Sequence, residues 1–484
     1  MKALSVLGTS SSAGKSWMTV ALCAWLRRQG VRVAPFKAQN MSNNAWATVD
    51  GTEIARAQAV QAEACGLLPT AEMNPILLKP TGGRGAQLVL RGVAQGHFAA
   101  VEYYKSFERL WGVVADTLEG WKTRCDVLVM EGAGSPVELN LMDRDLVNLR
   151  PIDYLDGRWV LVGDIDRGGI YAQLAGTWSL MPAASRARSL GAIINRFRGD
   201  LALFPDPQAW LSPHAPGLRV LGTVPLRSEL QPEEEDGLGA ADEDRGEGDT
   251  IAWIRLPHAS NLTDCQPWWD DEGVRVRWAA TPDQMSQARV VVLPGSKNTI
   301  ADLRWLRRTG MDRAILTAAA RGALVVGLCG GFQLLGERLE DREGVAGDVG
   351  DEAGLGLLPV HTQFHAQKIV RQVTAECDGR TWDTYEIHMG RSLLTAPCEP
   401  LQQVRENGVA RPEGLRAKNV WGTYLHGWFE APEVRQRVGE AARLSGHHVY
   451  PAPWSEKRRA IYAQMADHVA EHVDLEPIKR YVGL

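Results

Sequence analysis

The sequence predicts two α/β domains, and three observations support this fold class. In the first half of the chain, six short apolar runs alternate with helical stretches, which is the pattern of a mostly parallel, doubly wound sheet. Four further apolar runs continue the alternation in the second half. Between the two series, residues 231–250 hold nine acidic residues, one basic residue and four glycines, a composition that favours a flexible linker. We therefore expect domains over 1–230 and 251–440, followed by a helical extension over 441–484.

The predicted strands are short runs that are rich in β-branched and other apolar residues. In the first domain they lie near residues 3–7, 31–36, 126–130, 159–163, 189–194 and 219–224. In the second domain they lie near 251–256, 274–278, 289–293 and 323–328, and residues 299–308 form a predicted helix.

The loop after the first strand has the composition of a phosphate-binding loop. From Gly8 it reads Gly-Thr-Ser-Ser-Ser-Ala-Gly-Lys-Ser, and a predicted helix follows. Backbone N–H groups and the helix N-terminus of such a loop hold phosphates, Lys15 reaches the outer phosphates, and Ser16 ligates magnesium. Gly8 lies one position too early before Gly14, and Thr9 stands where the glycine is usual, so a structural glycine turn is the alternative. Because strand, loop and helix come in the required order, we expect ATP and Mg²⁺ as cofactors.

A carboxylate follows another apolar strand of the first domain. Residues 126–130 lead into Glu131, and Gly132 and Gly134 come next. A carboxylate at the carboxyl end of a strand beside a phosphate loop is a suitable Mg²⁺ ligand, so Glu131 and Ser16 are the predicted metal ligands. This segment and the phosphate loop resemble the dethiobiotin synthetase family, which uses ATP to activate a carboxylate.

In the second domain, Cys329 stands at a predicted turn between a strand and a helix. The apolar run before it suits a buried strand, and Gly327, Gly330 and Gly331 permit a tight turn that presents one side chain at the edge of the sheet. A thiolate at the start of a helix is stabilised there and acts as a nucleophile. The alternative is a small buried cysteine in a glycine-rich turn. His426, which is followed by Gly427, is the candidate base, and it favours the catalytic interpretation.

The two motifs Gly-Leu-Cys-Gly-Gly and Gly-Thr-Tyr-Leu-His-Gly resemble class I glutamine amidotransferases, which hydrolyse glutamine to release ammonia. Many members of that class carry an acidic residue two positions after the histidine, and Trp428 stands there in this chain. Glu430 is close but offset, which leaves the third catalytic residue open. The class also places an oxyanion-hole N–H on a glycine turn after a strand, which here is Gly295 or Ser296, with the N–H of Gly330 as its partner.

Longer blocks resemble one family, cobyric acid synthase. They lie at residues 34–41, 56–66, 73–80, 164–169, 195–200 and 385–391, within a likeness that runs from residue 1 to about 440. The resemblance implies ATP- and glutamine-dependent amidation of the b, d, e and g carboxylates of adenosylcobyrinic acid a,c-diamide, in cobalamin biosynthesis. It places adenine contacts at Asn195, and it places Lys37, Gln39, Asn40, Lys79, Asp164, Asp166 and Arg167 in the amidoligase site. For Lys79, Asp164 and Asp166, a role in bracing loops is an equal alternative.

Composition agrees with an ordinary globular enzyme. The chain of 484 residues is 45% hydrophobic and 23% charged, and its net charge of −5 gives no argument for a nucleic-acid partner. No apolar stretch is long enough to span a membrane, and seven scattered cysteines predict a reducing cytoplasm and no structural zinc. For His468 and His472 near the C-terminus we expect a solvated helix face.

Two other functions compete with this one. Cobyrinic acid a,c-diamide synthase shares both domain types, but the Phe-Lys-Ala-Gln-Asn-Met block at residues 36–41 favours cobyric acid synthase. Partitioning ATPases share the loop type and act as nucleotide-switched binding modules, yet they have no use for Cys329 and His426. The sequence leaves open the order of the amidations, the preferred corrinoid form, the ammonia route, the role of the C-terminal extension and the oligomeric state.

Overall fold

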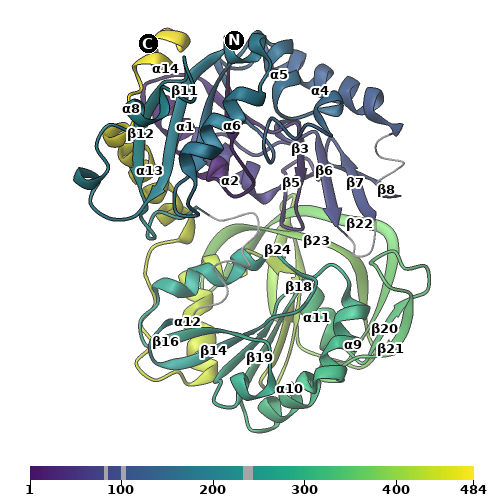
Figure 1. The fold of residues 1–484 in the computed structure, drawn as a ribbon. Coiled ribbons are helices and arrows are strands. Elements are labelled where there is room, and N and C mark those ends of the chain that lie inside the picture. The colour runs from purple at the N-terminus through teal and green to yellow at the C-terminus, as the bar shows by residue number, and fades with distance from the viewer. Residues whose placement is uncertain (81–84, 100–104, 233–243) are drawn as a thin grey trace.

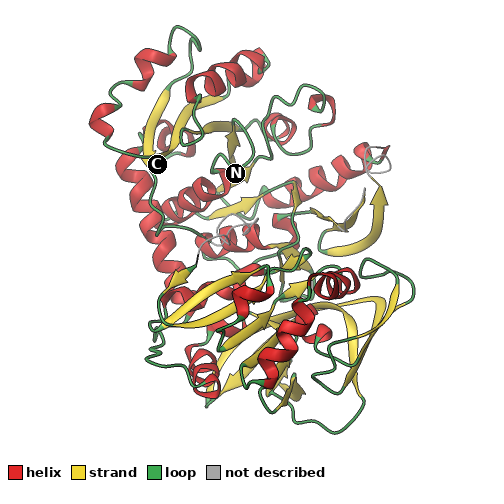
Figure 2. Ribbon diagram, turned by 60° about the horizontal axis from the view of Figure 1, so that its bottom comes forward, coloured by secondary structure: helices red, strands yellow, loops and turns green. Residues whose placement is uncertain are grey.

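The computed structural model describes residues 1–80, 85–99, 105–232 and 244–484. Two α/β domains follow one another along the chain, and the C-terminal helices return to the first domain (Figure 1). Helices flank the strands in both domains (Figure 2). Most of the predicted acidic linker, residues 233–243, lies outside the described residues.

The central sheet of the first domain contains all six predicted strands, which confirms the doubly wound parallel fold. Its strand order is β12-β11-β10-β1-β9-β2, and each neighbouring pair is parallel. The phosphate loop follows the middle strand β1, which lies between β9 and β10, so the loop emerges where the strand order reverses and ligands bind in such sheets. The strands are β1 (Lys2–Gly8), β2 (Val33–Phe36), β9 (Val127–Glu131), β10 (Arg158–Asp164), β11 (Ser189–Phe197) and β12 (Val220–Pro225).

Two hydrophobic cores cover the two faces of this sheet. Because side chains alternate along a strand, Leu4 and Val6 face one core while Ala3 and Leu7 face the other. The first of these cores contains α1 (Lys15–Arg28), part of α2 (Arg56–Cys65), α13 (Trp454–His472) and α14 (Glu476–Val482). The second contains α4 (Phe107–Trp121), α5 (Leu149–Tyr154) and α6 (Ile170–Leu180).

The C-terminal helices are therefore part of the first domain's core. Helix α13 packs along α1, and its Met465 and Val469 are fully buried. The expected solvated face is wrong for His468, which is only 4% exposed and whose Nε2 lies 2.9 Å from the carbonyl oxygen of Pro225.

The second domain also contains its predicted strands and helix. The strand order is β13-β16-β14-β17-β19-β27-β26, with parallel pairing throughout the interior. Helix α9 (Thr299–Thr309) confirms the predicted helix, and α10 (Met311–Ala320) follows it. The strands are β13 (Arg245–Gly246), β14 (Asp249–Ile254), β16 (Val274–Ala279), β17 (Val290–Leu293), β19 (Leu324–Leu328), β26 (Leu415–Ala417) and β27 (Val420–Thr423).

A large antiparallel hairpin was not among the predicted elements. Strands β22 (Val360–Cys377) and β23 (Arg380–Leu394) pair along most of their length and curve upward from the second domain toward the first (Figure 1). Asp378 and Gly379 form the turn, with φ of 48° and 79°. Asp-Gly in a two-residue hairpin loop is the sequence signal that could have revealed this element.

The first domain also contains small sheets that the sequence did not predict. One has the order β3-β6-β7-β8 and carries several candidate substrate residues on β3 (Gln39–Met41) and β6 (Ile76–Pro80), with β7 (Gly85–Leu90) and β8 (Val93–Ala99) beside them. The other is the hairpin of β4 (Ala45–Ala47) and β5 (Glu53–Ala55).

The β4 hairpin joins the two domains. The backbone N–H of Asn261 donates to Asn44 Oδ1 at 2.7 Å, and Ala45 N–H donates to Asn261 Oδ1 at 3.1 Å. Beside these bonds, the ring of Trp46 lies 4.2 Å from that of Tyr385, measured between centroids. Buried hydrogen bonds and an aromatic contact therefore hold the first domain against the part of the second that carries His426.

Candidate active sites

Cys329 occupies a strained turn between β19 and the short helix α11 (Gly330–Leu334). Its φ of 50° and ψ of −106° are unusual for a residue with a side chain, and such strain clusters at functional sites. The neighbouring glycines are required by space: a Cβ on Gly331 would lie 2.0 Å from the carbonyl oxygen of Leu293, and one on Gly327 would lie 2.6 Å from that of Gly331. The turn therefore has the predicted elbow geometry.

His426 and Cys329 line one pocket, where Cys329 Sγ lies 3.4 Å from the carbonyl oxygen of Ile387 and Cys329 raises the pKa of the imidazole. On the other side of the imidazole, Nδ1 lies 2.8 Å from Asp264 Oδ2, and Asp264 Oδ1 accepts a 2.7 Å hydrogen bond from Gly427 N–H. Thr384 Oγ1 donates to the carbonyl oxygen of His426. The three side chains Cys329, His426 and Asp264 therefore form a chain of the kind used in nucleophilic catalysis.

Asp264 is the residue that sequence reasoning missed. It lies on the short helix η4 (Leu262–Asp270), 162 positions before His426, in a segment without a recognisable local motif. Neither residue near the histidine takes this place: Trp428 is buried and donates to Gln402, and Glu430 pairs with Arg458 at 2.7 Å.

The charge state of His426 follows from these contacts. Burial lowers the pKa of the imidazole, but Asp264 and Cys329 outweigh that effect and raise the pKa of His426 to about 10. The arrangement therefore favours a positively charged imidazolium beside Cys329, where it can donate a proton.

The two segments that are predicted to form the oxyanion hole lie next to each other and beside His426. A Cβ on Gly330 would lie only 2.5 Å from the backbone nitrogen of Ser296, and one on Gly295 would lie 3.1 Å from His426 Cε1. The backbone at 295–296 thus packs closely against Gly330 and beside the imidazole. Which N–H groups hold an oxyanion stays a prediction.

In the first domain, the phosphate loop surrounds Lys15. Lys15 Nζ donates to the carbonyl oxygens of Ser10 and Gly134, at 2.8 and 3.0 Å. A cavity of about 400 Å³ lies against the loop, lined among others by Gly14, Lys15, Ser16 and Asn195. This is a suitable volume for a nucleotide-sized ligand.

Glu131 is the centre of the charged network in this cavity. One carboxylate oxygen accepts from Ser16 Oγ at 2.8 Å and from Lys37 Nζ at 2.9 Å, and the other accepts from Gln61. Burial disfavours the charged carboxylate, but the Lys37 ammonium and the hydrogen bonds hold the pKa of Glu131 below its usual value. An ionised carboxylate beside a serine hydroxyl is an oxygen donor set that fits Mg²⁺, so Ser16 and Glu131 are the residues that would hold the metal.

The structure brings some of the other predicted residues to this cavity and not the rest. Lys37, Gln39 and Asn40 line it, and Asn195 Nδ2 contacts the loop at the carbonyl oxygen of Ala13. Thr9 Oγ1 donates to Gln173, and Gly8 packs against the Lys15 side chain.

Asp164, Asp166 and Arg167 are not among the residues that line this cavity. Asp164 contacts Arg196 and Arg167, and Asp166 pairs with Arg198 at 2.6 Å. Lys79 lies at the pocket of Cys329 instead.

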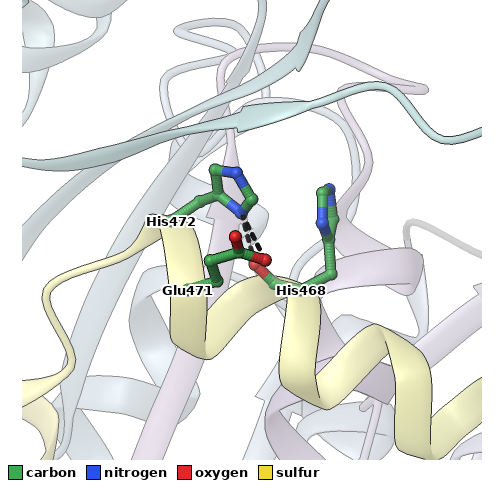
Figure 3. A group of neighbouring side chains, drawn as sticks. All are labelled: His468, Glu471 and His472. Atoms are coloured by element: carbon green, nitrogen blue, oxygen red, sulfur yellow. Dashed lines mark hydrogen bonds and ion pairs between the residues drawn. The ribbon is translucent and has the colours of Figure 1, made fainter.

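Helix α13 carries a separate group of possible metal ligands, His468, Glu471 and His472 (Figure 3). His468 Nε2 already contacts the carbonyl oxygen of Pro225, and His472 Nδ1 lies 2.9 Å from the carbonyl oxygen of His468. The first contact ties the helix to β12 and the second lies within the helix, so we assign the group a role in packing.

The fold and the two sites define a class: a P-loop nucleotide-binding domain joined to a glutamine amidotransferase domain. Residues 4–239 match the family model of the CobQ/CobB/MinD/ParA nucleotide binding domain, and residues 250–434 match that of the CobB/CobQ-like glutamine amidotransferase domain. No described helix is long and apolar enough to cross a bilayer.

Full-length relatives narrow this class to one family. The chain is 45% identical to the cobyric acid synthase of Roseiflexus castenholzii over 97% of this chain and 95% of the relative. It is 46% identical to that of Chloroflexus aggregans over 89% of each chain, and 40% identical to that of Syntrophobacter fumaroxidans over 99% of this chain and 98% of the relative. The chain belongs to the cobyric acid synthase family.

Proposed function

We propose that the chain catalyses the ATP- and glutamine-dependent amidation of the b, d, e and g carboxylates of adenosylcobyrinic acid a,c-diamide. The observation that carries this proposal is the presence of two candidate sites on one chain, the Cys329–His426–Asp264 group and the phosphate loop with Glu131. The relatives named cobyric acid synthase, which match over nearly the whole chain, support it over the diamide synthase and the partitioning ATPase alternatives.

In the second domain, the Cys329 thiolate attacks the side-chain amide carbon of glutamine. The N–H of Gly330 and one from the 295–296 turn stabilise the oxyanion. His426, charged and held by Asp264, donates the proton that lets ammonia leave. The neutral imidazole then takes a proton from water, which attacks the glutamyl thioester and releases glutamate.

In the first domain, the task is to make a carboxylate oxygen a good leaving group. Bound ATP with Mg²⁺ would supply the phosphoryl group for that purpose. Lys15 and the loop N–H groups would offset the charge of the phosphates, and Ser16 and Glu131 would hold the metal. Ammonia released by the second domain would then form the C–N bond at the activated carboxyl carbon, and the phosphorylated oxygen would leave as inorganic phosphate.

Product masses test the proposal. Purified protein with adenosylcobyrinic acid a,c-diamide, glutamine and Mg-ATP should give four successive amides, each about one mass unit lighter than its precursor because NH₂ replaces OH. One ATP should be consumed at each step. Two amidations of cobyrinic acid and none of its diamide would favour the diamide synthase instead, and no turnover of any corrinoid would exclude both.

A further inference from the structure

The pocket around Cys329 is built by both domains. The second domain contributes Cys329 and His426, and the first contributes Lys79 from β6. Lys297 and Lys368 line the same pocket. Three lysines therefore lie in the cavity that receives the substrate of the cysteine.

One carboxylate, Glu53 of β5, holds two of these lysines. Lys368 Nζ lies 2.7 and 2.8 Å from the two oxygens of Glu53, and Lys79 Nζ contacts the second oxygen. All three side chains are at least nine-tenths buried. Burial disfavours the charged carboxylate, but the lysines around it hold the pKa of Glu53 below its usual value. Glu53 is therefore an anion, and both of its carboxylate oxygens accept hydrogen bonds from these lysines.

Lys297 remains without such a partner. Among the residues that the structure describes, no carboxylate lies within ion-pair distance of its Nζ. Burial and the neighbouring Lys368 lower the pKa of Lys297 to about 8. Burial also lowers the pKa of Lys79, which shares Glu53 with Lys368. Lys297 is therefore a cation of this pocket without a carboxylate partner in the described part of the chain, and a carboxylate on a bound ligand would supply one.

We propose that Lys297 binds the α-carboxylate of glutamine. Lys368 and the Glu53–Lys79 pair hold the Lys297 side chain in position. This inference rests on the proposed glutamine hydrolysis. Glutamine has its reacting amide at one end and a carboxylate at the other. When the amide lies at Cys329, the carboxylate therefore lies elsewhere in the same pocket, where a cation can bind it. Because Glu53 and Lys79 belong to the first domain, the glutamine site is complete only when the two domains are joined.

The test compares two amides. L-Glutamine carries the α-carboxylate, and 4-aminobutanamide keeps the amine and the side-chain amide but lacks it. We expect Lys297→Met to lower kcat/KM for glutamine on the order of 100-fold, mainly through KM, because a charge-assisted hydrogen bond is lost. The same variant should change kcat/KM for 4-aminobutanamide by less than about twofold, and Lys297→Arg should recover part of the loss. Lys122→Met, which removes a surface lysine from the first domain, is the matched control.

A second readout does not depend on turnover. L-Glutamate should protect Cys329 from alkylation by iodoacetamide in the wild type, whereas 4-aminobutanoate, which lacks the α-carboxylate, should not. In Lys297→Met this protection should be lost, and in Lys79→Met it should weaken.

The outcomes separate the two proposals. Wild-type protein that does not hydrolyse glutamine overturns both. If the wild-type protein hydrolyses glutamine and Lys297→Met keeps the wild-type ratio of kcat/KM for glutamine to kcat/KM for 4-aminobutanamide, only the carboxylate assignment is overturned. An equal loss toward both amides overturns it as well, because Lys297 would then act on the nucleophile or on folding.

Discussion

Asp264 Oδ2 lies 2.8 Å from His426 Nδ1, although the two residues are 162 positions apart. The contact fixes the orientation of the imidazole and directs its other nitrogen to Cys329. Asp264 is 5% exposed and His426 is 1% exposed, so water does not replace the bond.

Asp264→Asn should lower kcat for glutamine hydrolysis by about 10² to 10⁴, because the imidazolium loses its stabilising charge and its preferred tautomer. The pKa of His426 should fall from about 10, so the alkaline limb of the pH–rate profile should move to lower pH. Ammonium-dependent amidation should remain. Glu430→Gln is the matched comparison, and a larger defect in that variant would contradict the assignment.

Cys329→Ala should abolish glutamine-dependent amidation and preserve amidation from high ammonium at alkaline pH, where neutral ammonia is abundant. Cys398→Ala, at a half-exposed cysteine outside the pocket, should behave as wild type. Loss of both activities in a folded Cys329→Ala protein would show that the nucleophile assignment is wrong or that the sites are strictly coupled.

Lys15→Ala and Glu131→Gln should each eliminate amidation from either nitrogen source, since carboxylate activation is common to both. Glutamine hydrolysis should persist at a reduced or normal rate. ATP turnover is the measurement, and Asp116→Asn, on an exposed side chain of α4, is the control. Unchanged ATP turnover in Lys15→Ala would exclude the loop as the nucleotide site.

Arg458→Met should destabilise the protein by about 3–5 kcal/mol, because it leaves Glu63 of the first domain and Glu430 of the second without their shared buried partner. The melting temperature of the first unfolding transition measures the effect. Arg28→Met breaks a pair with Asp467 on the same helix α13, but that pair is exposed and should contribute only about 0–1 kcal/mol. Equal effects of the two variants would contradict this prediction.

Glu413 provides a prediction on pH and stability. Burial raises the pKa of its carboxyl to about 7 from a usual value of 4.5, against the hydrogen bonds from Gln402 and Tyr424. Between those two pH values the native state binds more protons than the unfolded state, so stability should fall as pH rises through this window, by at most about 3 kcal/mol. Glu413→Gln should remove that slope in melting temperatures measured from pH 4.5 to 8, whereas Glu399→Gln, on an exposed side chain, should retain it. A slope that persists in Glu413→Gln would assign it to another group.

The parallel strands of both sheets were predictable because each is a local run of buried apolar residues between turns. The long hairpin β22–β23 was not, since its strands are partly exposed and mix polar with apolar residues; only Asp378-Gly379 marked it. For Lys79, the sequence predicts a place in the amidoligase site, with a bracing role as the alternative. In the structure, Lys79 Nζ contacts the Glu53 carboxylate and lines the pocket of Cys329.

The sequence by itself determined the two α/β domains, the strained elbow of Cys329, the phosphate loop and the carboxylate of Glu131. Each of these depends on neighbouring residues: the period of apolar side chains, the conformational freedom of glycine, and the order of strand, loop and helix. Only the tertiary structure decided that Asp264 orients His426, that Gln61 and Lys37 share Glu131, and that Lys79 reaches the other domain. The physical reason is that the partner of a buried charge is set by which distant segments pack together, and the packing of those segments leaves no local pattern in the chain.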